Sequence, residues 1–446
     1  MKILLLSTDE FTAQFDRRIV DLAECIIENG DQVVIQTLGE RAKLGSISGH
    51  LVIQFPRTFK KASADEARKV FFDETDLPME IESTSEARLM SFARVIWSHL
   101  PSRLKPYVHR LYRKVTYFSS KFKGANPNSP NSLADLYFSD AYGFWEANHQ
   151  GEYDLVIGTD IPSGIAAALL VAGSTKYWWY EAHEFATEQQ WLKQHHGFTP
   201  ELITVESHLV KRADVFSSVS KKLVTHMEET FGRNKKSIVL HNSTRSRQGD
   251  LKTQSSLPKP VLDTFQVPER IIVFHGVLSD LRGLSKFVEV FERACIRNWK
   301  FVLIGYNPGV ELLKTLRHAN KSTLLSAVDS SQVSEIVKMS DIVLMPYPVL
   351  DINTKYGFAN KLGDCIAEKI PFFYNKDLEA IDEVATLTNT GVPFSWSDLS
   401  DPEELQRALK DFENLTPDWE KAERLFGWTS FENTVLELLS DIKKVI

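Results

Sequence analysis

Two segments of the sequence carry side chains that could bind an anion or handle a proton. The first is residues 346–371, PYPVLDINTKYGFANKLGDCIAEKIP, which lies between two apolar runs. Asn360 could cap a helix there, Lys361 would lie in its first turn, and Asp364 would follow one turn later, near Lys361. A helix N-terminus with a lysine attracts a diphosphate, and a carboxylate can accept hydrogen bonds from both hydroxyls of a ribose. A capped surface helix with a solvated ion pair is the alternative.

The second segment is residues 180–188, YEAHEFATE, at the end of an aromatic run. A neutral His183 could hydrogen-bond a hydroxyl of a ligand there, and a neighbouring carboxylate, Glu181 or Glu184, would orient its ring. These three residues are our catalytic candidates. Two alternatives remain open. One is a histidine satisfied within the structure, and the other is a metal site with Glu181 or Glu184, for which the sequence shows no third and fourth ligand.

The composition indicates which class of protein must position these groups. With 446 residues, 43% hydrophobic and 25% charged, the chain is expected to form two globular domains. The net charge of -7 argues against nucleic acid as the main partner. Cys25, Cys295 and Cys365 match neither a zinc nor a disulfide spacing, which favours a reducing cytoplasm. We interpret residues 2–7 as a buried strand, not a signal peptide, and no apolar run is long enough to span a bilayer.

Short runs rich in Val, Ile and Leu alternate with stretches of helical periodicity, which predicts an α/β protein with parallel sheets. The strands expected in the first half are residues 2–7, 32–37, 51–55, 155–158, 176–180, 215–218 and 237–241. Those expected in the second half are residues 270–274, 300–305, 341–345 and 370–374, with helices near 284–295, 332–339 and 360–367. No G-x-G-x-x-G follows the first strand, which argues against a Rossmann dehydrogenase.

The predicted architecture is two Rossmann-like, doubly wound domains facing a cleft. Residues 1–243 would form the first domain, with a helical basic insertion at about 85–125. The polar, proline-containing stretch 244–268 would be a linker, 269–428 the second domain, and a helix at 429–446 would pack back on the first domain. Such sheets bind ligands at the carboxyl ends of their strands, so we expect the active site between the domains.

Residues 359–371, ANKLGDCIAEKIP, resemble the donor-binding pattern Pro-Asn-Lys-Leu-Phe-Glu-Tyr-x-Ala-x-Gly-x-Pro of the family-four retaining glycosyltransferases. By this resemblance Asp364 stands where the family has its ribose-binding Glu, and its side chain is one methylene shorter. The other Glu of the family's pair, eight positions earlier, is Tyr356 here.

Residues 274–284, FHGVLSDLRGL, resemble the strand, glycine turn and helix start of the same family. The resemblance implies that Gly276 lets the backbone approach the nucleotide and that Arg282 holds the diphosphate, for which a guanidinium is suited. Val277 stands where relatives often have a second basic residue. Taken without the resemblance, the segment would be a simple turn with a surface arginine.

The first half resembles the family in four further places, one of which is the stretch from Val205-Glu206 through Arg212-Ala213-Asp214 to Ser218-Val219-Ser220. Residues 180–188 are similar to its Tyr-Asp-x-His-Glu-x-x-x-Glu segment, with Glu181 in place of Asp. Residues 16–19, Asp-Arg-Arg-Ile, match an Asp-x-Arg pattern that opens the first helix. Asp160 precedes an Ile-Pro that begins a helix, and Thr159 stands where many relatives have a His.

The resemblance implies a GT-B fold and a retaining transfer of a sugar without a metal or any cofactor besides the nucleotide-sugar substrate. The second domain would bind the donor and the first domain a glycan or glycolipid acceptor. The implied donor-binding residues are Gly276, Arg282, Tyr356, Asn360, Lys361 and Asp364, and the acceptor-side residues are Asp16, Arg18 and Asp160. An inverting GT-B enzyme and a degenerate GT-B protein that binds a nucleotide or partner without turnover are the alternatives.

Residues 91–123 contain eight lysines and arginines, interleaved with apolar and aromatic residues, and no acidic residue. A basic, aromatic helix pair can lie on an anionic membrane surface. We therefore expect a cytoplasmic protein, with peripheral contact to the inner face of the cell membrane through this segment as one interpretation and a solvated helical insertion as the other.

Overall fold

The computed structural model describes the chain in several stretches. They are residues 1–8, 17–47, 50–57, 59, 61–74, 132–172, 174, 176–195, 197–246, 257–294, 296–329, 332–396 and 401–446. Asp16, Cys295 and the basic segment 91–123 lie outside these stretches, so what we predict for them stays a prediction.

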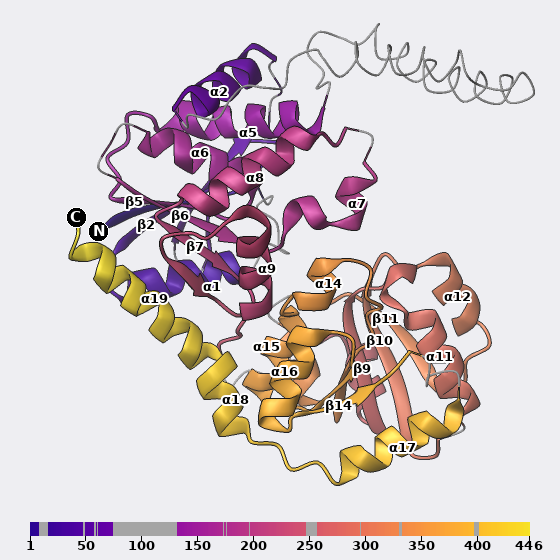
Figure 1. The fold of residues 1–446 in the computed structure, drawn as a ribbon. Coiled ribbons are helices and arrows are strands. Elements are labelled where there is room, and N and C mark those ends of the chain that lie inside the picture. Colours follow the sequence, from indigo (N-terminus) through magenta and orange to yellow (C-terminus); the bar gives the residue numbers. More distant parts are fainter. Residues whose placement is uncertain are drawn as a thin grey trace, which may run out of the picture.

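The first domain is built on a sheet of eight of the described strands, in the order β3-β4-β2-β1-β5-β6-β7-β8 (Figure 1). The strands are β1 Lys2–Ser7, β2 Gln32–Gly39, β3 Lys43–Ile47, β4 His50–Pro56, β5 Leu155–Gly158, β6 Tyr177–Ala182, β7 Val215–Ser218 and β8 Ser237–Val239. All neighbours pair in parallel except β3 and β4. The helices are α1 Arg17–Glu28, α2 Lys61–Glu74, α5 Leu133–Asn148, α6 Ile161–Val171, α7 Gln190–Lys193, α8 Pro200–Arg212 and α9 Lys221–Phe231, with the 3-10 turn η1 Ala186–Glu188.

The second domain has a fully parallel sheet in the order β11-β10-β9-β12-β13-β14. This is the Rossmann order, in which the winding reverses between the first strand, β9, and the fourth, β12. The strands are β9 Arg270–Val277, β10 Trp299–Tyr306, β11 Ser322–Ser326, β12 Ile342–Met345, β13 Phe372–Asn375 and β14 Gly391–Phe394. The helices are α10 Lys259–Phe265, α11 Leu284–Arg293, α12 Val310–Leu316, α13 Val333–Lys338, α14 Ile352–Tyr356, α15 Asn360–Glu368, α16 Glu379–Thr388, α17 Pro402–Glu413, α18 Trp419–Phe426 and α19 Trp428–Lys443, with the 3-10 turn η2 Asp280–Arg282.

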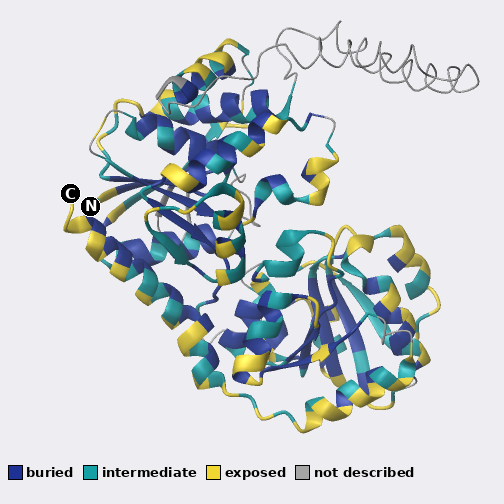
Figure 2. Cartoon of the chain, in the orientation of Figure 1, coloured by how far each residue is buried: buried dark blue, intermediate teal, exposed yellow. Residues whose placement is uncertain are grey.

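The apolar runs of the sequence are the central strands of both sheets. Residues 3–6 of β1 and 342–345 of β12 are fully buried, because helices cover both faces of each sheet (Figure 2). A strand buried on both faces reads as a continuous apolar run and not as an alternating one. The prediction of an α/β protein with two doubly wound domains is therefore confirmed.

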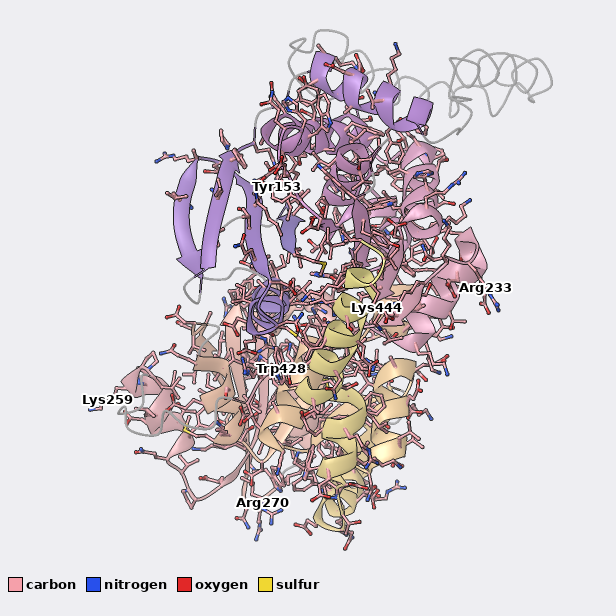
Figure 3. The ribbon with its side chains drawn as sticks, turned by 90° about the vertical axis from the view of Figure 1, so that its left-hand side faces the viewer. Tyr153, Arg233, Lys259, Arg270, Trp428 and Lys444 are labelled. Carbon is pink, nitrogen blue, oxygen red and sulfur yellow. The ribbon has the colours of Figure 1, made fainter. Side chains whose placement is uncertain are left out.

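The last helix, α19, returns to the first domain, where it packs on α1 (Figure 3). Its apolar face includes Phe431, Val435 and Leu439, which share a core with β1. Asp31 joins the two ends of the chain, since its carboxylate contacts the N-terminal amine at 2.6 Å and Lys443 Nζ at 2.8 Å. The described chain thus passes from the first domain to the second between β8 and α10 and returns between α18 and α19 (Figure 1).

Several elements differ from the sequence prediction, among them three strands and one helix. We did not expect the strands β3, β11 and β14, which lie at sheet edges; β11 contains two serines and β14 a proline, and neither reads as an apolar run. The helix α10 lies within residues 244–268, which we predicted to be linker without regular structure. It is seven residues long, too short to show periodicity, and it forms because Val261 and Phe265 are buried against the second domain.

Among the described residues, no helix is both long and apolar enough to cross a membrane.

Candidate active site

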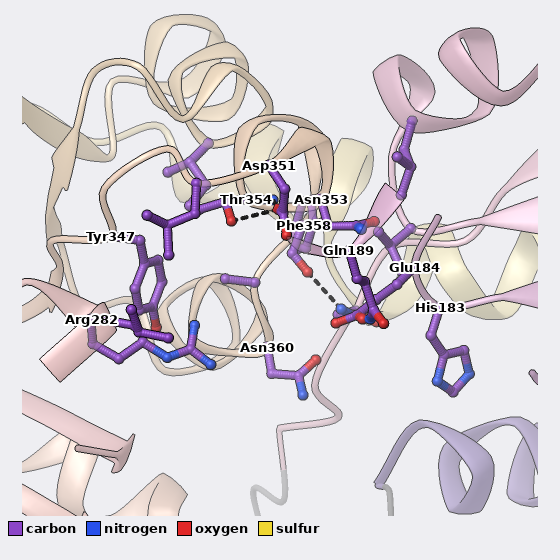
Figure 4. A pocket seen from close by; sticks show the side chains of 18 of the residues that line it. His183, Glu184, Gln189, Arg282, Tyr347, Asp351, Asn353, Thr354, Phe358 and Asn360 are labelled. Carbon is purple, nitrogen blue, oxygen red and sulfur yellow. Dashed lines mark hydrogen bonds between the residues drawn. The ribbon is translucent and has the colours of Figure 1, made fainter. Parts of the chain in front are cut away.

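A cavity of about 470 Å³ lies between the two domains. The second domain lines it with the loops that follow β9 and β12 and with the start of α15, and the first domain lines it with the segment that follows β6. Because β9 and β12 meet where the strand order reverses, the loops that follow them diverge and leave room for a ligand. Figure 4 shows Arg282 and Tyr347 on one side of the cavity and His183 and Glu184 on the other.

Two cations converge on the second-domain wall. The Arg282 guanidinium lies over the Tyr347 ring, 5.0 Å from its centroid, and Lys361 Nζ lies 4.5 Å from the centroid of Phe274 and 5.5 Å from that of Tyr347. Neither cation forms an ion pair with any residue that the structure describes. The aromatic faces stabilise the two charges without neutralising them. Both cations therefore remain available to an anion in the cavity.

Gly276, at the end of β9, allows this arrangement. Its φ of +107° belongs to the region that favours glycine, and a Cβ atom there would lie 3.3 Å from Lys361 Nζ. The next turn leads to Arg282 and ends at Gly283, whose φ of +74° starts α11. The glycine turn thus brings Arg282 near the first turn of α15, where Lys361 lies over the same Tyr347 ring.

The N-terminus of α15 differs in detail from our prediction. Ala359 occupies the N-cap position without a side-chain hydrogen bond, and Asn360 is the first helical residue. The prediction that Asn360 caps the helix is therefore wrong, because the extended backbone that a cap needs belongs to Ala359. The Asn360 side chain instead lines the cavity (Figure 4), beside backbone amides that receive no side-chain cap. Such amides add to the attraction of an anion.

Asp364 lies behind the cavity wall and is only 2% exposed. Its Oδ1 accepts hydrogen bonds from Arg17 Nη1, at 2.7 Å, and from Thr244 Oγ1, at 2.8 Å, so the carboxylate joins α1 of the first domain to α15. His275 Nε2 lies 3.7 Å from Oδ2. Burial alone would raise the pKa of Asp364, but Arg17, His275 and the hydrogen bonds hold it below its ordinary value. The alternative of a solvated surface pair with Lys361 is therefore wrong.

His183 and Glu184 line the cavity, and Glu181 supports them from within the first domain. Glu181 is 1% exposed, and its two oxygens contact the guanidinium of Arg18 and the imidazole of His183. Burial would raise the pKa of Glu181, but Arg18 and His183 lower it. An ionised Glu181 orients the His183 ring, as the sequence suggested. Arg18, which also donates to Asn242 Oδ1, is buried and does not line the cavity.

Two other predicted residues lie away from the cavity wall. Asp160 caps α6 through a hydrogen bond from Ser163 N at 2.9 Å, and its other oxygen accepts a bond from the backbone N of Thr8, also at 2.9 Å. The Tyr356 ring packs 5.6 Å from the His226 ring on α9, and Tyr356 does not line the cavity, although its neighbour Gly357 does. The structure therefore gives Asp160 a role in shaping the carboxyl edge of the first sheet, and Tyr356 a place in the contact between the domains.

Sequence reasoning missed several residues that line the cavity, among them Tyr347, Asp351 and Asn353. Asp351 caps α14 through Thr354 N at 2.8 Å, and a short Asp-x-x-Thr pattern could have revealed this. Tyr347 stands between two prolines directly after β12, where a ligand loop was expected. The contacts of Asn353 reach across 168 residues of sequence, so no local pattern indicates them.

No cluster of three or more His, Cys, Asp or Glu that could hold a metal occurs within the described stretches.

Comparisons with known proteins are informative at the level of structure. No protein-family model and no curated protein sequence matches the chain. The structure resembles sucrose-phosphate synthase of Thermosynechococcus elongatus, with a TM-score of 0.66 at 13% identity over 100% of both chains. It also resembles Anabaena HepE in complex with UDP and glucose, with a TM-score of 0.60 at 13% identity over 99% of this chain and 100% of that one.

A third similar structure is an α,α-trehalose-phosphate synthase (UDP-forming) from Burkholderia vietnamiensis, with a TM-score of 0.60 at 11% identity over 100% of both chains. All three comparisons extend over essentially the whole chain, so both domains and their arrangement are shared. The chain therefore has the GT-B fold of the glycosyltransferases that it resembles, as the sequence predicted.

Proposed function

We propose that the protein is a glycosyltransferase that moves a sugar from a nucleotide-sugar donor to a hydroxyl of a glycan or glycolipid acceptor. The observation that carries this proposal is the convergence of Arg282, Lys361 and the N-terminus of α15 on one wall of the cavity between the domains. Three sources of positive charge in so small a space suit a diphosphate. The complex of HepE with UDP and glucose, which has the same fold, supports this choice of ligand.

The same groups suit the chemical step. Negative charge grows on the diphosphate as the bond to the sugar breaks, and fixed cations that are already in place stabilise that charge more in the transition state than in the ground state. Arg282 and Lys361 are held by the rings of Tyr347 and Phe274, so they need little reorganisation. A retaining outcome without a metal is proposed on the resemblance of residues 359–371 and 274–284 to the retaining family.

Asp364 is proposed to bind the ribose, and the structure adds a condition to this role. Arg17 and Thr244 both occupy Oδ1 of Asp364, so a ribose hydroxyl would have to use Oδ2 or replace one of them. On the opposite wall, His183 and Glu184 are proposed to hold hydroxyls of the transferred sugar or the acceptor, with Glu181 fixing the ring of His183.

Thermal stability with UDP-, GDP-, ADP- and CMP-sugars tests the proposal. We expect one nucleotide class to raise the Tm of the wild type, because a ligand that binds only the folded state stabilises it. Lys361→Ala should abolish the shift. Lys314→Ala is the matched control, since Lys314 is an exposed lysine of the same domain paired with Glu311. A wild type that responds to none of the four classes would contradict a nucleotide-sugar donor.

One observation favours the alternative of a protein without catalytic activity. Arg17 and Thr244 already donate hydrogen bonds to Asp364 Oδ1, which leaves less of the carboxylate for a ribose. Turnover separates the two possibilities. We expect the wild type to release the nucleoside diphosphate slowly from the donor by hydrolysis and faster when a suitable acceptor is added. A protein that binds the donor but releases no diphosphate, with or without a panel of glycan and glycolipid acceptors, would be a nucleotide-binding protein.

A further inference from the structure

We propose that Asn353 is a positioning residue that couples the donor-binding domain to the His183–Glu184 segment, so that the first-domain wall of the cavity is completed only when the two domains are closed. This inference rests on the proposed function. It concerns an interdomain contact that no sequence pattern indicated.

The contact is a pair of hydrogen bonds between a side chain and a backbone. Asn353 Oδ1 accepts from the N–H of Phe185 at 2.6 Å, and Asn353 Nδ2 donates to the carbonyl oxygen of Phe185 at 2.9 Å. The side-chain amide thus binds both polar groups of one residue, directly after His183 and Glu184. A third contact lies nearby, where the backbone N–H of Gln190 donates to Asp351 Oδ2 at 3.2 Å.

The first domain holds the same segment from its other side. The Glu206 carboxylate, which is fully buried, accepts from the backbone N–H groups of Ala186 and Thr187 at 2.8 and 2.9 Å. Residues 185–190 are therefore fixed by α8 of their own domain and by α14 of the other. If the domains separate, the segment keeps Glu206 but loses Asn353 and Asp351.

The position of Asn353 links this contact to the donor. Asn353, Thr354 and Gly357 line the same cavity as Arg282 and Lys361, and Asp351 fixes the start of α14. A donor bound to the second domain would lie beside α14. Through the Asn353–Phe185 hydrogen bonds, α14 would hold the His183–Glu184 segment next to that donor. Assembly of the site by domain closure excludes water from the bond that breaks.

The inference is tested by comparing Asn353→Ala with Asn353→Asp and with Lys222→Ala. The carboxylate of the Asn353→Asp variant can still accept from the Phe185 N–H but cannot donate to the Phe185 carbonyl. Lys222 of α9 forms an interdomain ion pair with Glu379 at 2.8 Å, and Glu379 keeps a second partner, Lys355, so Lys222→Ala controls for the loss of one interdomain contact that does not involve the Phe185 backbone. The measurements are kcat and KM for transfer, the rate of donor hydrolysis without acceptor, Kd for the nucleoside diphosphate, and Tm.

We expect Asn353→Ala to lower kcat for transfer at least tenfold, while Kd for the nucleoside diphosphate rises by a smaller factor, because the two contacts are coupled, and Tm changes little. Hydrolysis should fall less than transfer, so the ratio of hydrolysis to transfer should rise, because water needs no positioned acceptor wall. Asn353→Asp should be intermediate, and Lys222→Ala should keep kcat within twofold. An unchanged kcat in Asn353→Ala, or an equal loss in Lys222→Ala, would overturn the inference.

Hydrogen exchange gives a second readout that needs no turnover. In the wild type, UDP or the nucleotide identified by thermal shift should slow exchange of the amides of residues 183–190, and Asn353→Ala should remove this protection. Protection that persists in the variant would also overturn the inference. A wild type that binds no nucleotide and turns over no donor would instead show failure of the proposed function.

Discussion

The second-domain wall of the cavity takes its two cations from Arg282 and Lys361, which rest on aromatic rings of the same domain, whereas the first-domain wall depends in part on a contact from the other domain. The His183–Glu184 segment is held by Glu181, by Glu206 and by Asn353 of the other domain. The comparison teaches that the second-domain wall is built within one domain and is already in place, while the first-domain wall is completed by a contact from the other domain. Changes on the two walls should therefore differ in kind, affecting binding on one and the rate of transfer on the other.

The largest effect is expected for Lys361→Ala on the second-domain wall, which we propose binds the donor. A charge-assisted hydrogen bond contributes about 1.5–3 kcal/mol, so Kd for the nucleoside diphosphate should rise by roughly ten- to a hundredfold. Isothermal titration calorimetry measures this change. Because Lys361 packs on Phe274 and forms no ion pair among the described residues, the variant should keep the Tm of the unliganded protein within a few degrees. A large fall in Tm with unchanged Kd would contradict the idea of a prebuilt donor wall.

Gly276→Ala should affect stability and binding together. A side chain at a φ of +107° costs on the order of 1–3 kcal/mol of folding free energy, and the added Cβ would press on Lys361 Nζ. We expect urea unfolding to show this loss and Kd for the nucleotide to rise several-fold. Gly30→Ala is a useful control, since it has a φ of +81° but nothing within 4 Å of the added Cβ, so it should lose stability without any change in Kd.

Arg17→Gln tests the contact that joins α1 of the first domain to α15 of the second. Arg17 Nη1 and the ribose are proposed to compete for Asp364, so removal of the guanidinium should tighten nucleotide binding several-fold. It should also destabilise the protein by about 1–3 kcal/mol, since a buried carboxylate loses a charged partner. Calorimetry and urea unfolding measure the two effects. Weaker nucleotide binding in Arg17→Gln would show instead that Arg17 contacts the nucleotide.

The smallest effect concerns the pH dependence of the first-domain wall. Burial raises the pKa of Glu206 to about 7 from an ordinary value of 4.5, although hydrogen bonds from Thr187 and Ala186 oppose the shift. A carboxyl whose pKa is raised by folding contributes stability below its unfolded pKa, and that stability is lost as the pH rises through the folded pKa. The loss should therefore occur between about pH 4.5 and 7.

Glu206→Gln removes this titration and keeps one oxygen to accept from the backbone. The Tm of the variant relative to the wild type should rise between about pH 5 and pH 8, by a few degrees. Differential scanning fluorimetry over this pH range measures it. Glu201→Gln on the same helix is the control. Glu201 forms an ion pair with Arg68 at 2.6 Å, so this variant also loses a buried carboxylate, but its Tm relative to the wild type should not rise between about pH 5 and pH 8. A difference in Tm that does not vary with pH would mean that Glu206 is ionised throughout.

Most of the fold could be predicted from the sequence because it depends on local patterns. Strands such as β1, β5 and β7 have the predicted bounds, since a strand covered on both faces reads as a mostly apolar run. The edge strands β3, β11 and β14 were missed because they are polar, short or interrupted by a proline. The helix α10 was missed because only two of its residues, Val261 and Phe265, are buried, and two apolar residues in seven do not form a recognisable helical pattern.

The sequence by itself determined the alternation of strands and helices and the glycine turn at Gly276, because each depends on neighbouring residues and on backbone geometry. Only the tertiary structure decided that Asp364 faces Arg17, 347 residues away, and that Asn353 holds Phe185, 168 residues away. Local periodicity and spacing constrain a residue through its neighbours along the chain. The direction of a side chain across a domain boundary depends on how two complete sheets pack, and no short pattern encodes that packing.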